Sequence, residues 1–256
     1  MKIYSWNTLR TNSTENALAL IRSLEFDVMC LQEVPPPLLA ELKKLPFSLA
    51  ADVESTYTLR GVAKEDYSVV LSRYPIATSG SLRFPASPFP LRMRLFALLV
   101  RPPGWKHFGG RHSMYADIET PQGALRVFSI HLSLSHPSAR LHEFDMLADN
   151  MRSDAPNVLA GDFNLLDSPH ITPLNWIYGG TVRDALLYKR ERSAFEERFA
   201  SLHLQNVLLG TRTQLQAFCQ LDHILIPDDW RVTQAQVIAQ RHGSDHHPIF
   251  VEASRS

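Results

Sequence analysis

The feature that most constrains this chain is a series of short apolar runs that each adjoin an acid, an amide or a histidine. These residues are Asn7 after residues 3–6, Gln32 and Glu33 after 28–31, His131 after 127–130, Asp162 and Asn164 after 158–160, and Asp245 and His246 before 248–250. Runs of this length are typical of buried strands. A single polar residue at a strand end is ordinary. Repeated polar ends are not, because a buried carboxylate is costly unless it is paired or binds a metal. In α/β sheets, ligands bind at such strand ends.

Helical and strand patterns alternate along the whole chain, which predicts the α/β class. Helical spacing predicts helices over 13–24, 38–45 and 139–151. Strands are expected over 3–6, 28–31, 68–72, 95–100, 114–119, 125–130, 157–160, 221–226 and 249–252. We find no internal repeat, low-complexity block or linker. The 256 residues are therefore interpreted as one domain, residues 1–256.

Composition and charge exclude several classes of protein. The formal net charge is zero, which argues against coating nucleic acid by bulk charge but allows a local basic face. The two cysteines, Cys30 and Cys219, form no disulfide framework, and Cys30 lies in an apolar run that is typical of a buried thiol. The N-terminus has no pattern of a signal peptide, and no apolar run has the length of a membrane span. We expect a cytoplasmic, monomeric protein with no stable membrane association.

The types of residue at the strand ends select the chemistry. Asp, Glu and Asn supply hard oxygen ligands, which suit Mg²⁺ or Mn²⁺ better than zinc. No His-Glu-x-x-His spacing occurs. The pairs Asp162/Asn164 and Asp245/His246 place a titratable group beside a predicted metal site. Such a set is suited to the attack of water on a phosphoryl centre.

Six short motifs resemble, in order, those of the endonuclease/exonuclease/phosphatase superfamily, which has the DNase-like fold. They begin at Ser5, Leu31, Ile130, Gly161, Leu221 and Ser244 and read SWN, LQEV, IHL, GDFN, LDHI and SDHHP. The resemblance runs from residue 5 to residue 248. It implies a four-layer α/β sandwich, in which two mixed β-sheets pack face to face with helices outside. It also implies a Mg²⁺- or Mn²⁺-dependent phosphoesterase.

The resemblance also implies a role for each matching residue. The implied metal ligands are Glu33 as the principal carboxylate, Asn7 as a supporting amide, and Asp245 as an acid that acts through water. The implied catalytic residues are His131, Asp162, Asn164, Asp222 and His246. Among these, Asp222 orients His246, while His131 and Asn164 donate to the phosphate. Whether Asp162 or His246 takes the proton from water stays open.

A local asymmetry of charge bears on the substrate. No acidic residue lies between Asp66 and Asp117, whereas that stretch holds seven arginines and lysines. Within it, residues 101–111 alternate basic and aromatic side chains, and we expect Arg101, Trp105, Lys106 and Arg111 to contact a nucleic acid. An ordinary solvated loop is the competing interpretation. The expected partner and substrate is DNA, cleaved by an endonuclease or exonuclease.

Other substrates stay open. The histidine in the IHL motif is shared by the secreted DNase, sphingomyelinase and tyrosyl-DNA phosphodiesterase branches of the superfamily, whereas AP endonucleases usually have a tyrosine in this segment. A phospholipid phosphodiesterase would more naturally be secreted or have an apolar hairpin that contacts the membrane, and residues 84–91 are a faint candidate for such a hairpin. An enzyme that processes DNA ends is the second alternative. A phosphomonoesterase on a small sugar or inositol phosphate and a catalytically silent binding module are the least supported.

Overall fold

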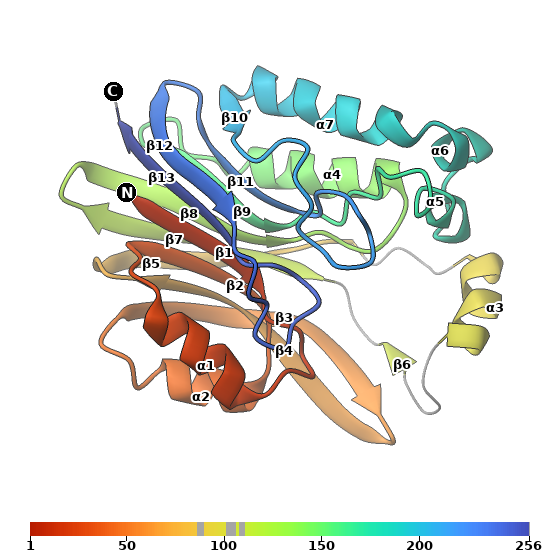
Figure 1. Ribbon diagram of the computed structural model, residues 1–256, viewed down its shortest axis with the longest axis horizontal. Coiled ribbons are helices and arrows are strands. Elements are labelled where there is room, and N and C mark those ends of the chain that lie inside the picture. Colours follow the sequence, from red (N-terminus) through yellow and green to blue (C-terminus); the bar gives the residue numbers. More distant parts are fainter. Residues whose placement is uncertain (86–89, 101–105, 108–110, 256) are drawn as a thin grey trace.

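The computed structural model describes residues 1–85, 90–100, 106–107 and 111–255, and over these it consists of two mixed β-sheets packed face to face (Figure 1). The first sheet has the order β12 (Trp230–Val237), β13 (Ile249–Arg255), β1 (Lys2–Asn7), β2 (Val28–Val34), β4 (Val62–Ser72), β3 (Ser48–Leu59) and β6 (Lys106–His107). The second has the order β10 (Leu204–Asn206), β11 (Asp222–Pro227), β9 (Asn157–Asp162), β8 (Gly123–His131), β7 (His112–Thr120) and β5 (Ile76–Arg83).

Helices cover the outer face of each sheet, so the fold is the four-layer sandwich that the sequence predicted (Figure 1). The first sheet is covered by α1 (Thr14–Ser23) and α2 (Pro36–Leu42), and the second by α4 (Pro137–Ala148) and α7 (Tyr188–Ser201). The helices α3 (Leu91–Val100), α5 (Leu174–Ile177) and α6 (Val182–Leu186) lie at the end of the molecule opposite the two termini. No helix among the described residues is both long and apolar enough to cross a membrane.

Strand alternation explains the layers. In β1, Ile3 points into the core between the sheets, while Tyr4 and Trp6 pack under α1 and α2. In β8, Val127 joins the central core, while Phe128 and Ile130 pack under α4 and α7. Strands that are buried on both faces read as continuous apolar runs, which is why these segments were predictable.

Two parallel strand pairs bring the polar strand ends together. β1 runs parallel to β2, so that Asn7 is level with Gln32. β8 runs parallel to β9, so that His131 is level with Asp162, and antiparallel β11 places Asp222 opposite Asp162. The carboxyl ends of both parallel pairs therefore lie near one another, with the start of β11 beside them.

One predicted element is wrong. Residues 95–100 were expected to form a strand but belong to α3. Residues 95–100 are all apolar, and periodicity alone cannot separate a buried strand from a helix in such a run. The Leu, Met and Ala residues of α3 favour the helix, whereas β-branched residues, which favour strands, are scarce in it.

Candidate active site

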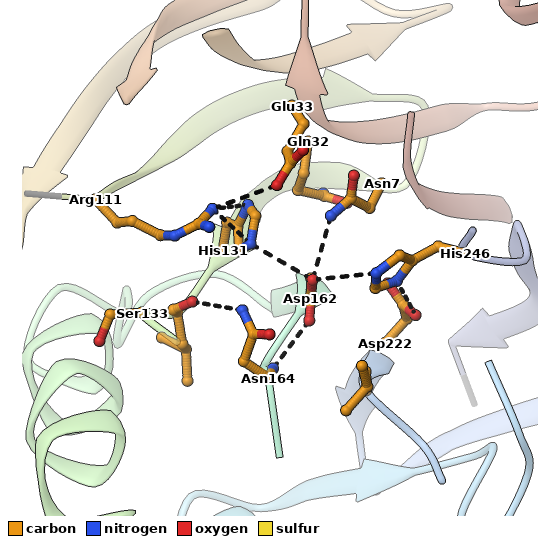
Figure 2. Close-up of polar contacts among 12 residues, drawn as sticks. Asn7, Gln32, Glu33, Arg111, His131, Ser133, Asp162, Asn164, Asp222 and His246 are labelled. Carbon is orange, nitrogen blue, oxygen red and sulfur yellow. Dashed lines mark hydrogen bonds and ion pairs between the residues drawn. The ribbon is translucent and has the colours of Figure 1, made fainter. Parts of the chain in front are cut away.

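Two histidines, His131 and His246, face the same aspartate (Figure 2), and a buried carboxylate lies against each ring. Nδ1 of His131 lies 2.6 Å from Oε1 of Glu54, and Nδ1 of His246 lies 2.9 Å from Oδ2 of Asp222. The Nε2 atoms of the two rings then lie 3.4 and 3.8 Å from Oδ2 of Asp162. A carboxylate on Nδ1 fixes the orientation of an imidazole and leaves Nε2 for a substrate.

Asp162 is held from several sides. Nδ2 of Asn7 donates to its Oδ2 at 3.2 Å, and the backbone N–H of Asn164 donates to its Oδ1 at 2.9 Å. Asp162 is almost fully buried. Its carboxylate is therefore a fixed acceptor between the two histidine rings.

The glycine before Asp162 is required by close packing of two strands. A Cβ on Gly161 would lie 1.9 Å from the carbonyl oxygen of Ile130 in β8. Only glycine permits this approach, which places the end of β9 beside His131 at the end of β8.

Asn164 forms a structural link beside the site. One amide N–H donates to the carbonyl oxygen of Leu132 at 2.8 Å, and the residue has a positive φ of 53°. Asn tolerates this left-handed conformation better than most residues. The link ties the segment after β9 to the segment that follows His131.

β-Bulges direct two of the acids into the site. Glu33 has a φ of 53° and lies where the β2–β4 register shifts between Leu31 and Val34. Glu54 lies where the β3–β4 register shifts between Val53 and Ser55. A bulge redirects a side chain and is common beside active sites. The backbone N–H of Glu33 donates to Oε2 of Glu54 at 3.0 Å, which couples the two acids.

Glu33 forms a buried, two-pronged ion pair with Arg10. Nη2 and Nε of Arg10 lie 2.6 and 2.9 Å from the two carboxylate oxygens, and Nη1 of Arg10 lies 3.2 Å from Oδ2 of Asp66. Burial alone would raise the pKa of Glu33, but the Arg10 guanidinium outweighs it and holds that pKa well below its ordinary value. Burial raises the pKa of Asp66 to about 6 although Arg10 opposes the rise.

His246 holds its proton firmly. Burial would lower the pKa of His246, but the charges of Asp222 and Asp162 raise it to about 10. Burial pushes the pKa of Asp222 upward as well, so the pair retains one proton up to high pH. At neutral pH His246 is therefore a donor.

Oxygen ligands fit a hard divalent cation here. Glu33, Glu54 and His131 offer one set of ligand atoms within 4.8 Å of one another, and Asp162, Asp222 and His246 offer a second. Oδ2 of Asp245 accepts from Gln214, while Oδ1 of Asp245 is buried without a hydrogen-bond partner among the described residues. An orphaned carboxylate oxygen beside such sets fits the predicted Mg²⁺ or Mn²⁺.

The predicted substrate residues divide into three cases. Arg111 lies in the site: its Nη1 is 2.6 Å from the ring nitrogens of His131 and 3.2 Å from Oε1 of Glu54. Lys106 belongs to β6, whose backbone pairs with β3. Arg101 and Trp105 lie outside the described residues. The interpretation of residues 101–111 as a DNA-contacting loop thus stays a prediction, except that Arg111 adjoins His131.

Three site residues were missed from the sequence, namely Glu54, Asp66 and Arg10. Glu54 and Asp66 lie inside long strands with mixed polar neighbours, where no motif marks them. Arg10 lies three residues after the SWN motif, and this closeness was the only sign in the sequence that it belongs to the site.

Comparison with known families agrees with this geometry. The sequence model of the Endonuclease/Exonuclease/phosphatase family matches residues 4–246. The chain belongs to this family. It is accordingly a phosphoesterase of the endonuclease/exonuclease/phosphatase type, and enzymes of this family generally use divalent metals. A comparison with curated proteins returns no match.

Solved structures of the same family share the fold. An endonuclease/exonuclease/phosphatase from Beutenbergia cavernae is 17% identical with a TM-score of 0.69, over 100% of this chain and 72% of that one. A 3′ phosphatase from Neisseria, bound to a product DNA hairpin, is 17% identical with a TM-score of 0.64, over 99% of both chains. A mannosyl-6-phosphatase from Bacteroides thetaiotaomicron is 17% identical with a TM-score of 0.60, also over 99% of both chains. At such identities the likeness shows the fold alone.

Proposed function

We propose that this phosphoesterase hydrolyses phosphodiester bonds in DNA with the help of Mg²⁺ or Mn²⁺. The observation that carries the proposal is the convergence of two histidine–carboxylate pairs on Asp162 (Figure 2). Two donors that flank one acceptor match the needs of in-line hydrolysis, in which water loses a proton while negative charge grows on the phosphoryl oxygens.

The chain's own residues have distinct parts in this scheme. Glu33, Asn7 and Asp245 would hold the cation, which when bound supplies Lewis-acid polarisation of the phosphate. Asp162 receives the proton of the attacking water, because it is the acceptor fixed between two rings. His246 donates from Nε2, because its raised pKa keeps it protonated at neutral pH.

His131 acts beside His246 as the second donor. Glu54 lies against its Nδ1, and we assign Nε2, which lies 3.4 Å from Asp162 and 2.6 Å from Nη1 of Arg111, to the reacting phosphate. Arg111 adds a positive charge on the same side of the site. Removing either histidine should lower the rate by about 10²-fold or more, the scale of a lost acid–base group or charge donor.

The charge distribution and one structural neighbour support DNA as the substrate. The stretch between Asp66 and Asp117 has no acidic residue, and Arg111, which belongs to it, contacts His131 in the site. Guanidinium groups suit recognition of phosphates. The Neisseria structure of the same fold holds a DNA hairpin, and a family relative on DNA makes this substrate class reasonable for our chain.

The test is a panel of substrates assayed with and without Mg²⁺ or Mn²⁺. It contains circular, linear and single-stranded DNA, RNA, sphingomyelin, an aryl phosphodiester and an aryl phosphomonoester. The variants are His246→Ala and, as a matched control, His203→Ala, whose side chain is 85% exposed and remote from the site.

We expect metal-dependent cleavage of DNA that is lost in His246→Ala and kept in His203→Ala. Turnover of the lipid or the monoester without DNA cleavage would reject DNA as the substrate while leaving the site intact. Full DNA cleavage by His246→Ala would reject the proposed mechanism.

A further inference from the structure

Helix α3 exposes four leucines on one side. Leu91, Leu95, Leu98 and Leu99 are 71%, 57%, 81% and 85% exposed. With 3.6 residues per turn, these positions fall within about 100° of arc around the helix. We call these four residues the leucine face. Single exposed leucines are common on proteins, whereas a contiguous apolar face usually marks an interaction site.

The opposite side of α3 is packed, so the helix has a fixed orientation. Met93 is buried in a small apolar cluster with Ala217, Cys219 and Tyr178, and Phe96 packs against this cluster. A helix with apolar residues on two opposite sides normally has partners on both. Here the inner side has its partners within the chain, and the leucine face has none among the described residues.

Basic and aromatic groups border the leucine face. Arg94 is exposed on one flank. On the other, Arg92 donates to the carbonyl oxygen of Gly180 at 2.7 Å and stacks on Trp176 at 4.6 Å, and Trp176 is itself 42% exposed. Leucines that are flanked by arginine and tryptophan form the side-chain pattern of a helix that lies in a membrane interface.

From this arrangement we propose that the leucine face is a docking surface for an anionic phospholipid membrane. Charge complementarity selects this partner, since α3 carries Arg92 and Arg94 and lies within the 50-residue acid-free stretch between Asp66 and Asp117 of a chain whose formal net charge is zero. A nucleic acid would complement the arginines but would leave the leucines in water. The lipid surface accommodates both.

Membrane contact here would turn toward the lipid the end of the sandwich at which β1 ends. α3 lies at the end of the sandwich toward which β1 runs, away from both termini (Figure 1). Asn7, at the end of β1, is a site residue. This inference revises the expectation, made from the sequence, of no stable membrane association. The proposed membrane docking applies to any phosphoester substrate and does not rest on DNA cleavage.

The test is co-sedimentation of the full chain with phosphatidylcholine vesicles, with and without phosphatidylserine. The variant Leu98→Glu/Leu99→Glu changes two residues that are almost fully exposed, so its circular dichroism and melting temperature should match the wild type. Leu209→Glu is the matched control, because Leu209 is 58% exposed and lies outside α3 and its packing cluster. Arg94→Glu tests the charge.

We expect the wild type and Leu209→Glu to bind vesicles that contain phosphatidylserine, and to bind less as salt increases. The double variant should partition at least about 10-fold more weakly, because each leucine loses its burial in lipid. Arg94→Glu should lose preference for phosphatidylserine. Equal binding of the double variant and wild type, or no wild-type binding, would overturn the proposal. A wild-type dimer in light scattering that the double variant abolishes, without vesicle binding, would overturn it in favour of a second copy of the chain.

Discussion

Replacing Arg10 with methionine should destabilise the metal-free protein and increase its response to a divalent cation. The change leaves Glu33 and Asp66 without the guanidinium that bridges them at 2.6 and 3.2 Å. Breaking a buried ion pair by removing one partner costs about 3–5 kcal/mol. For a domain of this size about 1 kcal/mol corresponds to roughly 2–4 °C, so the melting temperature should fall by roughly 6–20 °C.

The cation should recover part of this loss because it would compete with Arg10 for Glu33. Both oxygens of Glu33 accept from Arg10, so an ion that binds Glu33 in the wild type must share or displace the guanidinium. The variant frees these oxygens from the guanidinium of Arg10. At a concentration 100 times its Kd, an ion stabilises the folded state by about 2.7 kcal/mol, which is roughly 5–11 °C here.

The assay is thermal unfolding during titration with Mn²⁺ and with Mg²⁺, supported by calorimetric measurement of Kd. Arg198→Met is the matched control, because Arg198 forms an ion pair with Asp145 in which both side chains are about half exposed. Such a pair contributes about 0–1 kcal/mol, so this variant should behave as the wild type does. If Mn²⁺ raises the melting temperature of the wild type as much as that of Arg10→Met, the competition for Glu33 does not exist.

Three further changes test the rest of the site. Glu54→Gln should lower kcat by about 10²-fold or more with a melting temperature close to that of the wild type, and an unchanged kcat would reject the role of Glu54 in orienting His131. The folded-state pKa of His246 lies near 10, above its unfolded value near 6.5, so its stabilising effect is complete below pH about 6.5 and lost as pH rises to 10. The double variant His246→Gln/Asp222→Asn should therefore show a flatter decline in unfolding free energy between pH 7 and 10, and an equal decline would reject the assignment. Gly161→Ala should cost about 1–3 kcal/mol or more in urea unfolding, because its Cβ would meet the β8 backbone at 1.9 Å, and an unchanged midpoint would contradict this packing.

The residues at the ends of apolar runs were predictable because burial and alternation mark the strands that carry them. Asn7, His131 and Asp162 follow runs that are buried on both faces, and the parallel pairs β1–β2 and β8–β9 of the two sheets bring the ends of these runs near one another. Family motifs then supplied Asp222 as the partner of His246, which lies 24 residues away.

Glu54 could not be found in this way, because its position depends on a bulge. A regular β3 strand alternates its side chains, and the sequence around Glu54 gives no sign of the register shift that directs it toward His131. Residues 95–100 of α3 were predicted as a strand for a related reason. A uniformly apolar run has no periodicity, so only its packing distinguishes helix from strand.

The site is divided between the two sheets, and therefore its geometry depends on how they pack. The first sheet supplies Asn7, Glu33 and Glu54, whereas the second supplies His131 and Asp162.

Apolar contacts alone would let the two sheets slide by small amounts, since the hydrophobic effect is not directional. A buried polar link limits such movement near the site: Oγ of Ser129 in β8 accepts from Nε2 of Gln32 in β2 at 3.1 Å and lies 2.9 Å from Oγ of Ser68 in β4. Ser129 precedes His131 by two residues, and Gln32 adjoins Glu33. Breaking this link would leave buried polar groups without hydrogen-bond partners, which is costly. Hydrogen bonds that have no part in the chemistry therefore specify how the two sheets are placed against each other. They also specify the distance between Glu33 and the histidines.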